Sequence, residues 1–304
     1  MATLNRKQKE RLKSGLTIFL FLLPAMTVYF SYTVFGIFRT FYFSGFDWSG
    51  FGPAYRSPFI GLQNYVSLMS DSGFWRSVRN NFTLVFVSLV FQLTFGMILA
   101  LILNARYKGT KILRTIYFMP LLLSSAATGT IWQLMLSPHI GLFDGVLRFI
   151  SPDVHLSWLG SEQVVLFAVL FVICWQFTPQ YMILIRAGMT GIPEELYEAA
   201  TIDGASRWQQ FWRMTLPLLS GTLKTAAVLS IVGSLQFFDL IWIMTLGGPS
   251  GHSDLMATFM YRAAFVQMRM GYASAVAACM IIISLIVVVI FRTITRKEGG
   301  GSHS

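Results

Sequence analysis

Six long stretches of this sequence contain no charged residue or only one, and they constrain the possible fold more than any other feature. They are residues 15–38, 80–105, 115–136, 163–185, 225–246 and 271–291, with lengths of 24, 26, 22, 23, 22 and 21. About 20 apolar residues in a helix cross the roughly 30 Å of hydrocarbon in a bilayer. The sequence therefore predicts an all-α integral membrane protein, a bundle of six transmembrane helices.

The composition supports this class, with 55% hydrophobic and 12% charged residues. Residues 1–14 form a basic N-terminus, 15–291 the six-helix domain and 292–304 the C-terminus, whose last residues, 299–304, are interpreted as an expression scar. The first apolar stretch is too long for the core of a signal peptide, so we expect it to be retained. Cys174 and Cys279 lie inside apolar stretches and indicate neither a disulfide framework nor a metal site.

The basic residues flank the apolar stretches, which indicates membrane topology rather than binding of nucleic acid. With the N-terminus inside, 16 Lys and Arg residues fall in the inner segments and seven in the longer outer ones. Both termini and the 186–224 segment are therefore expected in the cytoplasm. The outer loops are rich in Gly, Pro and aromatic residues and could dock an extracytoplasmic partner.

The inner segment 186–224 contains signals for two short helices. Pro193 suits a first helical position, and Glu194 and Glu195 follow in the first turn, where carboxylates favour the positive end of the helix dipole. Gly204 is expected to supply the left-handed turn that ends this helix.

Ser206 can cap a second helix, which would place Trp208, Phe211 and Trp212 on one side. Periodicity alone also allows an amphipathic pair that lies on the lipid headgroups.

One string in this segment is more specific than its periodicity. It combines Glu198-Ala199-Ala200, Asp203-Gly204, Met214 and Leu216-Pro217. This string resembles the EAA loop of bacterial ABC importer permeases, with Met214 where the family more often has Ile. Further matches to the carbohydrate-uptake branch of these permeases follow in the same order: 60–65 with Phe74-Trp75, Leu103-Asn104, 114–120, 132–138 with Gly141, and Gly247-Gly248-Pro249 with Gly271-Tyr272-Ala273.

The resemblance implies a coupling helix that sits in a groove of a cytoplasmic ATPase subunit. Carried over to this chain, the coupling residues are Glu198, Ala199, Ala200, Asp203, Gly204, Leu216 and Pro217. It also implies four kinds of partner: a second homologous permease, two ATPase subunits, an extracytoplasmic solute-binding protein and the lipid membrane. The sequence has no G-x-x-x-x-G-K-[ST] loop, so we expect ATP and Mg to bind only to the partner ATPases and no cofactor to bind this chain.

Several polar and aromatic side chains inside the apolar stretches are candidates for the solute pathway. Gln176 and Gln180 are four residues apart, as are Ser230 and Ser234, so each pair is expected to share a helix face. Amides, hydroxyls and aromatic rings together suit a neutral sugar, and the resemblance implies a sugar site on these two helices. The candidates are Trp175, Gln176, Gln180, Ser230, Ser234, Phe237 and Asp239. The alternative is that they join helix to helix.

Asp239 is the one acid within an apolar stretch. It could pair with Arg262 or Arg269, cap a broken helix, or contact the solute. An ion-coupled secondary transporter would need an intramembrane ion site, for which only Asp239 is available. No nucleophile, metal or acid–base cluster indicates a membrane enzyme.

The expected function is thus inward transport of a sugar, oligosaccharide or polyol by a multi-pass subunit in a bacterial cytoplasmic membrane. The same scaffold could import another solute, such as a glycerol phosphate.

Overall fold

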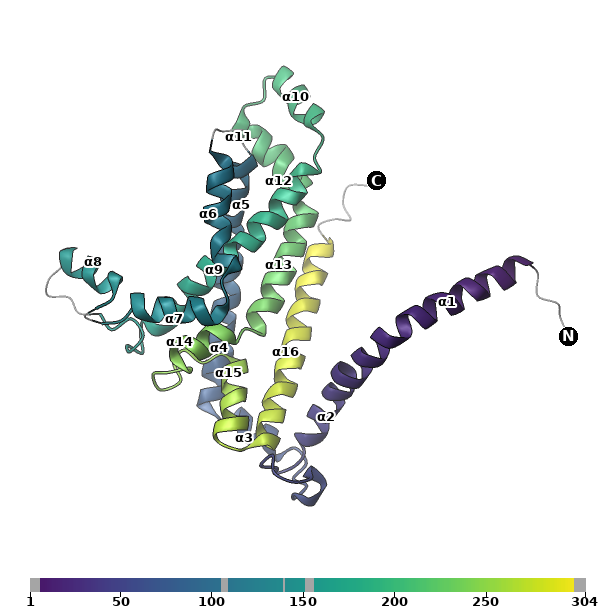
Figure 1. Cartoon of the computed structure of the whole chain (residues 1–304), viewed down its shortest axis with the longest axis vertical. Coiled ribbons are helices and arrows are strands. Elements are labelled where there is room, and N and C mark those ends of the chain that lie inside the picture. Colours follow the sequence, from purple (N-terminus) through teal and green to yellow (C-terminus); the bar gives the residue numbers. More distant parts are fainter. Residues whose placement is uncertain (1–5, 105–108, 139, 151–155, 298–304) are drawn as a thin grey trace. The chain divides into compact units, whose positions relative to one another are not determined.

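The computed structural model describes residues 6–104, 109–138, 140–150 and 156–297, which are helical apart from loops and one isolated bridge (Figure 1). Most of the N-terminal basic segment is included, whereas the expected scar at 299–304 lies outside the described residues. The helices are α1 (Arg6–Tyr29), α2 (Phe35–Phe43), α3 (Gln63–Met69), α4 (Ser72–Val87), α5 (Leu93–Asn104), α6 (Thr110–Leu122), α7 (Ser125–Met135), α8 (Leu142–Ile150), α9 (Val165–Thr190), α10 (Glu194–Ile202), α11 (Arg207–Gln210), α12 (Leu216–Leu218), α13 (Ser220–Leu235), α14 (Asp239–Thr245), α15 (Met256–Tyr261) and α16 (Met270–Lys297).

Four continuous helical segments are long and apolar enough to span a membrane: 17–43, 72–104, 165–190 and 270–295. The number rises to six if two bent pairs each count as one span, α6 with α7 at 99° and 207–218 with α13 at 65°. The all-α membrane fold is therefore confirmed. Six spans are reached when each bent pair counts as one span, and the structure also interrupts two of the predicted stretches, 115–136 and 225–246.

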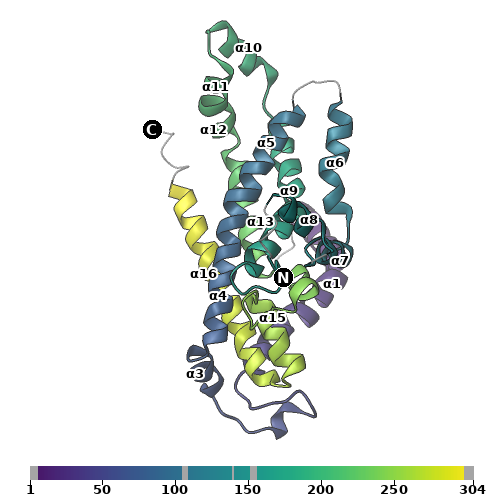
Figure 2. The ribbon, with the colours of Figure 1, turned by 90° about the vertical axis from the view of Figure 1, so that its left-hand side faces the viewer.

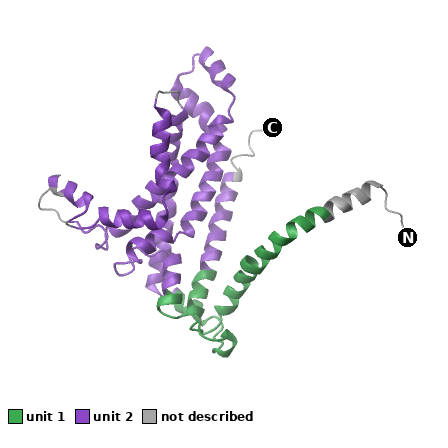
Figure 3. Ribbon diagram, in the orientation of Figure 1, with its two compact units in different colours: residues 1–68, 263–278 green, residues 69–262, 279–304 purple. Residues whose placement is uncertain are grey.

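The chain divides into two compact units (Figure 3). The first comprises residues 1–68 and 263–278. In it, α1 and α2 form one continuous rod through a π-helical turn at Phe30–Val34. No residue of the apolar span 17–43 is buried. Asn64 donates to the carbonyl oxygens of Ser44 (2.8 Å) and Phe46 (3.0 Å), which fixes the loop that follows α2.

The second unit comprises residues 69–262 and 279–304 and is organised around α9. Helix α5 packs closely on α9, because a Cβ added at Gly96 would lie 3.1 Å from both the Met182 nitrogen and the Tyr181 Cβ. Small residues permit such close helix contact in membranes, where lipid tails compete with side chains for apolar surface. Met97, Met182 and Ile185 are buried in the resulting core.

The predicted 115–136 span is broken at Leu123 and Ser124. Leu123 has extended backbone (ψ 140°), and Ser124 caps the next helix by accepting a hydrogen bond from the Ala127 N–H at 3.2 Å. A serine that bonds to its own helix start offers the backbone an alternative to continuing the helix. The result is two helices, α6 and α7, in place of one.

The predicted 225–246 span is broken at 236–238, where no Gly or Pro occurs. The Asn81 side chain of α4 donates to the Ser234 carbonyl at 2.8 Å and to the Leu235 carbonyl at 3.4 Å, at the C-terminal end of α13. These carbonyls are therefore satisfied without a further helical turn. Asp239 then begins α14.

Within the second unit, the two views place the adjoining ends of α5 and α6 near α10 and α11, at the end where α16 also finishes (Figures 1 and 2). Helix α15 and the N-terminal end of α4 lie at the opposite end. Lys111, Arg114 and Arg186, which the sequence assigns to the inner side, belong to the α10 end.

Candidate functional sites

The segment from α10 to α12 forms a projecting pair of short helices, as the sequence predicts. Helix α10 begins at Glu194, one residue later than expected, with Pro193 as its N-cap. Gly204 has a φ of +79°, the left-handed conformation expected for it. Ser206 caps α11 in a capping box, in which its hydroxyl accepts from the Gln209 N–H and the Gln209 side chain accepts from the Ser206 N–H.

Two side-chain contacts hold α10 against the residues that follow it. The Tyr197 hydroxyl lies 3.0 Å from the Thr215 hydroxyl, and Gln210 donates to the Thr201 hydroxyl (3.0 Å) and to the Ala205 carbonyl (3.1 Å). The sequence analysis did not predict these contacts. Polar residues among the apolar ones of each short helix, such as Tyr197 and Gln210, could have indicated them. These hydrogen bonds join α10 to the residues of and after α11.

The outer surface of this pair exposes large apolar side chains among the described residues. Ile202 is 87% exposed and Trp208 is 69% exposed. Glu198 and Ala199 are exposed, and Ala200 is half-buried. An exposed apolar surface on a projecting element is typical of a protein-binding site. A hollow of about 370 Å³ opens beside it and is lined by Asp203, Gly204, Ala205, Gln209, Gln210, Arg213 and Met214.

The base of the pair packs on α9. Leu216 and Phe211 contact the buried cluster that contains Met182, Ile185 and Met189. Pro217 is exposed at the adjacent turn. A displacement of the projecting pair would therefore act directly on the C-terminal half of α9.

The two helix breaks of the second unit meet the middle of α9. The buried Gln176 side chain donates to the Leu123 carbonyl at 3.1 Å, beside the break between α6 and α7. The side-chain amide oxygen of Gln176 (Oε1) is buried and has no hydrogen-bond partner among the described residues. The neighbouring Phe177 packs edge to face against Phe237, at the break between α13 and α14, with ring centres 5.7 Å apart.

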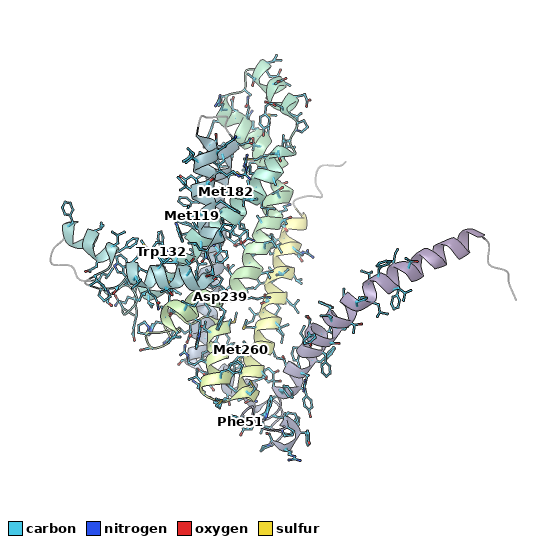
Figure 4. All side chains as sticks on the ribbon, in the orientation of Figure 1. Phe51, Met119, Trp132, Met182, Asp239 and Met260 are labelled. Atoms are coloured by element: carbon cyan, nitrogen blue, oxygen red, sulfur yellow. The ribbon has the colours of Figure 1, made fainter. Side chains whose placement is uncertain are left out.

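Helices α7 and α14 pair beyond these breaks. Gln133 donates to the Ile243 carbonyl (2.8 Å) and the Met244 carbonyl (3.1 Å). Asp239, labelled in Figure 4, is exposed at the start of α14 and accepts a hydrogen bond from the Ser125 hydroxyl at 3.4 Å. Of the three roles considered for Asp239, its position matches that of an acid beginning a helix after a break.

The remaining pathway candidates do not all meet at one point. Gln180 is exposed on α9, whereas Ser230 and Ser234 are buried in α13. Trp175 contacts Trp132 edge to face at 5.4 Å and lines an apolar cavity of about 700 Å³ between α5, α6 and α9. The structure thus places Gln176 and Phe237 at the breaks, and Trp175 on an apolar cavity that Leu123 of the α6–α7 break also lines.

A buried polar network fixes the segment that precedes α15. Asn80 donates to the His252 and Asp254 carbonyls, both at 2.9 Å, and Asn81 accepts from the Met256 N–H at 2.7 Å. Sequence reasoning missed both asparagines, because Asn80 is simply the first residue of the predicted 80–105 stretch.

Asp254 is the acid of this network. It pairs with Arg262, and the Thr258 hydroxyl donates to it at 3.0 Å. Arg262 is therefore the partner of Asp254, and the proposed pairing of Asp239 with Arg262 is wrong. Burial raises the pKa of the Asp254 carboxyl to about 6, although the neighbouring Arg262 charge lowers it. A Cβ on Gly247 would overlap both side chains, so only glycine fits there.

Comparison with known proteins identifies the class of this chain. Residues 92–298 match the family described as binding-protein-dependent transport system inner membrane component. The match covers more than half of the chain, and the chain belongs to this family. It is an ABC transporter permease, a transport subunit rather than an enzyme.

Several relatives align over most of their length. The chain is 34% identical over 272 residues to a probable ABC transporter permease of Pyrococcus horikoshii, covering 89% of this chain and 92% of the relative. It is 35% identical over 247 residues to the trehalose/maltose transport system permease protein MalF of Thermococcus litoralis (81% and 83% covered). It is also 30% identical over 280 residues to the multiple sugar-binding transport system permease protein MsmF of Streptococcus mutans (91% and 94%).

A solved structure shares the fold. A chain of a bacterial ABC transporter that imports the acidic polysaccharide alginate superimposes with a TM-score of 0.83 at 24% identity, covering 96% of this chain and 99% of that one. The sugar-transport permeases among the sequence relatives confirm the resemblance to the carbohydrate-uptake branch.

Proposed function

We propose that this chain is the membrane-spanning permease of a heteromeric importer that moves a carbohydrate into the cell by alternating access. The observation that carries the proposal is the projecting α10–α11 pair, whose exposed EAA string and apolar surface suit an ATPase groove. Relatives named for trehalose/maltose and multiple-sugar transport support a carbohydrate as the solute. The remaining subunits would be a second permease, two ATPases that bind ATP and Mg, and an extracytoplasmic solute-binding protein.

In this account, ATPase closure moves α10 and the movement reaches α9 through the base of the pair. Glu198, Ala199 and Ala200 would contact the ATPase, and Gly204 would fix the angle between the two short helices. Leu216 would transmit the displacement to α9 through the cluster that contains Ile185. Because packed cores switch between discrete arrangements, a small shift at α10 could change the arrangement at the helix breaks.

The solute pathway would run past the breaks at Leu123 and at 236–238. Discontinuous helices in transporters place free backbone groups and polar side chains at mid-membrane depth, where lipid would otherwise forbid them. Gln176, Phe237 and Asp239 lie at or beside these breaks. The unpaired amide oxygen of Gln176 could accept a hydrogen bond from a sugar hydroxyl.

Uptake by the reconstituted complex tests this function. Phe237→Ala removes an aromatic surface at the break, and we expect it to lower uptake of a radiolabelled maltodextrin or trehalose about five- to tenfold. Phe86→Ala is the matched control, because Phe86 is 68% exposed on the same unit and belongs to α4, outside both helix breaks. Basal ATPase activity and subunit co-purification should stay at wild-type values in both variants.

Equal uptake in the two variants would remove Phe237 from the pathway. Uptake of a glycerol phosphate but of no sugar would replace the proposed solute with the alternative one.

The proposed orientation places both termini and the α10–α11 pair in the cytoplasm. Single cysteines at Ser57 and Ser206, in a chain lacking Cys174 and Cys279, can be tested with an impermeant thiol reagent on intact cells. We expect labelling at position 57 and none at 206 until the membrane is permeabilised. The reverse pattern would contradict this orientation.

A further inference from the structure

A groove of about 870 Å³ lies between α6 and α9 at the α10 end of the second unit. None of its lining residues belongs to α10 or α11, and one end of it reaches Leu122, the residue before the break at Leu123. Residues of α6 from Lys111 to Leu122 and of α9 from Met182 to Thr190 line the groove. Met119 and Met182, labelled in Figure 4, line it from the two helices.

Three cations line one end of the groove. Lys111 and Arg114 are three residues apart on α6, and Arg186 faces them from α9. No acidic residue lines the groove. Among the described residues, no ion pair or side-chain hydrogen bond joins these three cations to any other group. The site therefore holds uncompensated positive charge.

Arg186 shows most directly that an acceptor belongs here. Its Nε atom is buried and has no hydrogen-bond partner among the described residues. A buried donor without a partner is unfavourable, and more so when it is charged. A bound anion would satisfy it and would stabilise the neighbouring Lys111 and Arg114 as well.

Apart from the three cations, Thr115 and Thr190, the lining of the groove is apolar. Phe118, Met119 and Leu122 line it from α6, and Met182 and Ile183 line it from α9. On α6 these residues follow the two cations toward the C-terminal end of the helix, and on α9 they precede Arg186. The groove thus offers positive charge at one end and an apolar channel along the rest, the two properties of a phospholipid-binding site.

We propose that this groove binds an anionic phospholipid, with the headgroup phosphate on Arg186, Lys111 and Arg114 and an acyl chain along Phe118 and Leu122. Basic pockets between transmembrane helices near the cytoplasmic face are suited to anionic headgroups. Free phosphate shares the headgroup chemistry, but it would leave the apolar part of the groove unfilled. The bound lipid would fix the spacing of α6 and α9 beside the base of the α10–α11 pair.

Native mass spectrometry of the intact transporter tests the proposal without solute or ATP, so its outcome is independent of transport activity. The purified complex is exchanged into detergent with equal amounts of phosphatidylglycerol and phosphatidylcholine. We expect preferential retention of phosphatidylglycerol, about fivefold less in Arg186→Gln. Arg292→Gln is the matched control, since Arg292 is an exposed cation on α16 outside the groove, and it should retain lipid as the wild type does.

A second variant separates lipid from free phosphate. Leu122→Trp fills the apolar part of the groove and leaves all three cations, so it should lose the lipid as well. Excess inorganic phosphate should displace little lipid from the wild type. If Arg186→Gln prevents assembly, the double variant Lys111→Gln, Arg114→Gln replaces it, because both side chains are exposed.

Three results would overturn the proposal. They are wild-type retention in Arg186→Gln or in its replacement, equal retention of phosphatidylcholine, and full displacement of the lipid by inorganic phosphate, which would make the groove a phosphate site.

Discussion

The second unit contains two irregular segments that connect helices, and they are held in opposite ways. The segment around α10 and α11 is exposed, and its side-chain hydrogen bonds join residues no more than 18 positions apart, as for Tyr197 and Thr215. The segment from 236 to 256 is largely buried and is held by α4, through hydrogen bonds of Asn81 with Ser234 and with Met256, across 153 and 175 positions. Each also contains glycine with positive φ.

The difference in burial and in the range of the hydrogen bonds suits the two segments to different tasks. A segment that engages a partner subunit needs accessible surface and a shape set by its own short-range contacts. A segment that shapes a solute pathway must hold broken backbone inside the bundle, where every polar group needs a partner. Substitutions in the first should therefore impair coupling, and substitutions in the second should impair folding or assembly.

Asn81→Ala should have the largest effect. It leaves the Ser234 and Leu235 carbonyls and the Met256 N–H without their side-chain partner, and we expect a loss of about 3 kcal/mol or more in stability. Thermal melting and yield of the purified complex measure this loss. Asn104→Ala is the control, because Asn104 is exposed at the end of α5, and it should melt as the wild type does.

Unchanged melting of Asn81→Ala would mean that the buried segment is not held from α4. The comparison between the two segments would then fail.

Gly204→Val should abolish coupling with little change in assembly. A Cβ at Gly204 meets nothing within 4 Å, so the only penalty comes from its φ of +79°, about 1–3 kcal/mol. Strain of that size can shift the equilibrium between two arrangements of the permease about tenfold. Gly221→Val is the matched control. A Cβ at Gly221 also meets nothing within 4 Å, but Gly221 lies in α13 without a positive φ.

The measurement is uptake together with ATPase stimulation by solute-loaded binding protein. Similar losses in Gly204→Val and Gly221→Val would indicate that the angle between α10 and α11 has no special role.

The smallest expected effect is a pH dependence that arises at Asp254. Its folded pKa is about 6, above the ordinary value of 3.8, so the folded chain binds this proton more tightly than the unfolded chain. The stability that the proton provides is full below about pH 4 and is lost as pH rises through about 6. We expect the wild-type melting temperature to fall between about pH 5 and 7 more steeply than that of Asp254→Asn.

Glu195→Gln, which removes an exposed carboxylate, should keep the wild-type slope. If Asp254→Asn keeps it too, another group sets the pH dependence.

The α10–α11 segment could be predicted from the sequence because its determinants are local. Pro193 with two glutamates, Gly204, and Ser206 with Gln209 each act within four residues. Helix α10 begins one residue after the predicted start and ends before Gly204, and Ser206 caps α11 as predicted. The π-helical turn at Phe211–Thr215 was not predicted. Hydrophobic stretches of sufficient length likewise predict membrane helices without knowledge of their neighbours.

The two helix breaks could not be predicted in the same way. The break at 236–238 has neither Gly nor Pro, and it depends on an asparagine 153 positions away in the chain. At Leu123, the Ser124 cap is a local signal, but a continuous apolar stretch obscured it. The sequence also grouped Trp175 with Gln180 as pathway candidates, because their spacing does not show that Trp175 lines an apolar cavity between α5, α6 and α9.

The central claim is that the exposed α10–α11 surface docks on the ATPase, and site-specific crosslinking tests it most directly. A photoreactive residue at Ile202, which is 87% exposed, should crosslink to the ATPase subunit in the assembled complex. The same residue at Phe149 of α8, which is 92% exposed on a segment assigned to the outer side, should not. Crosslinks from position 202 to lipid alone would contradict the claim. They would support the alternative that α10 lies on the lipid headgroups.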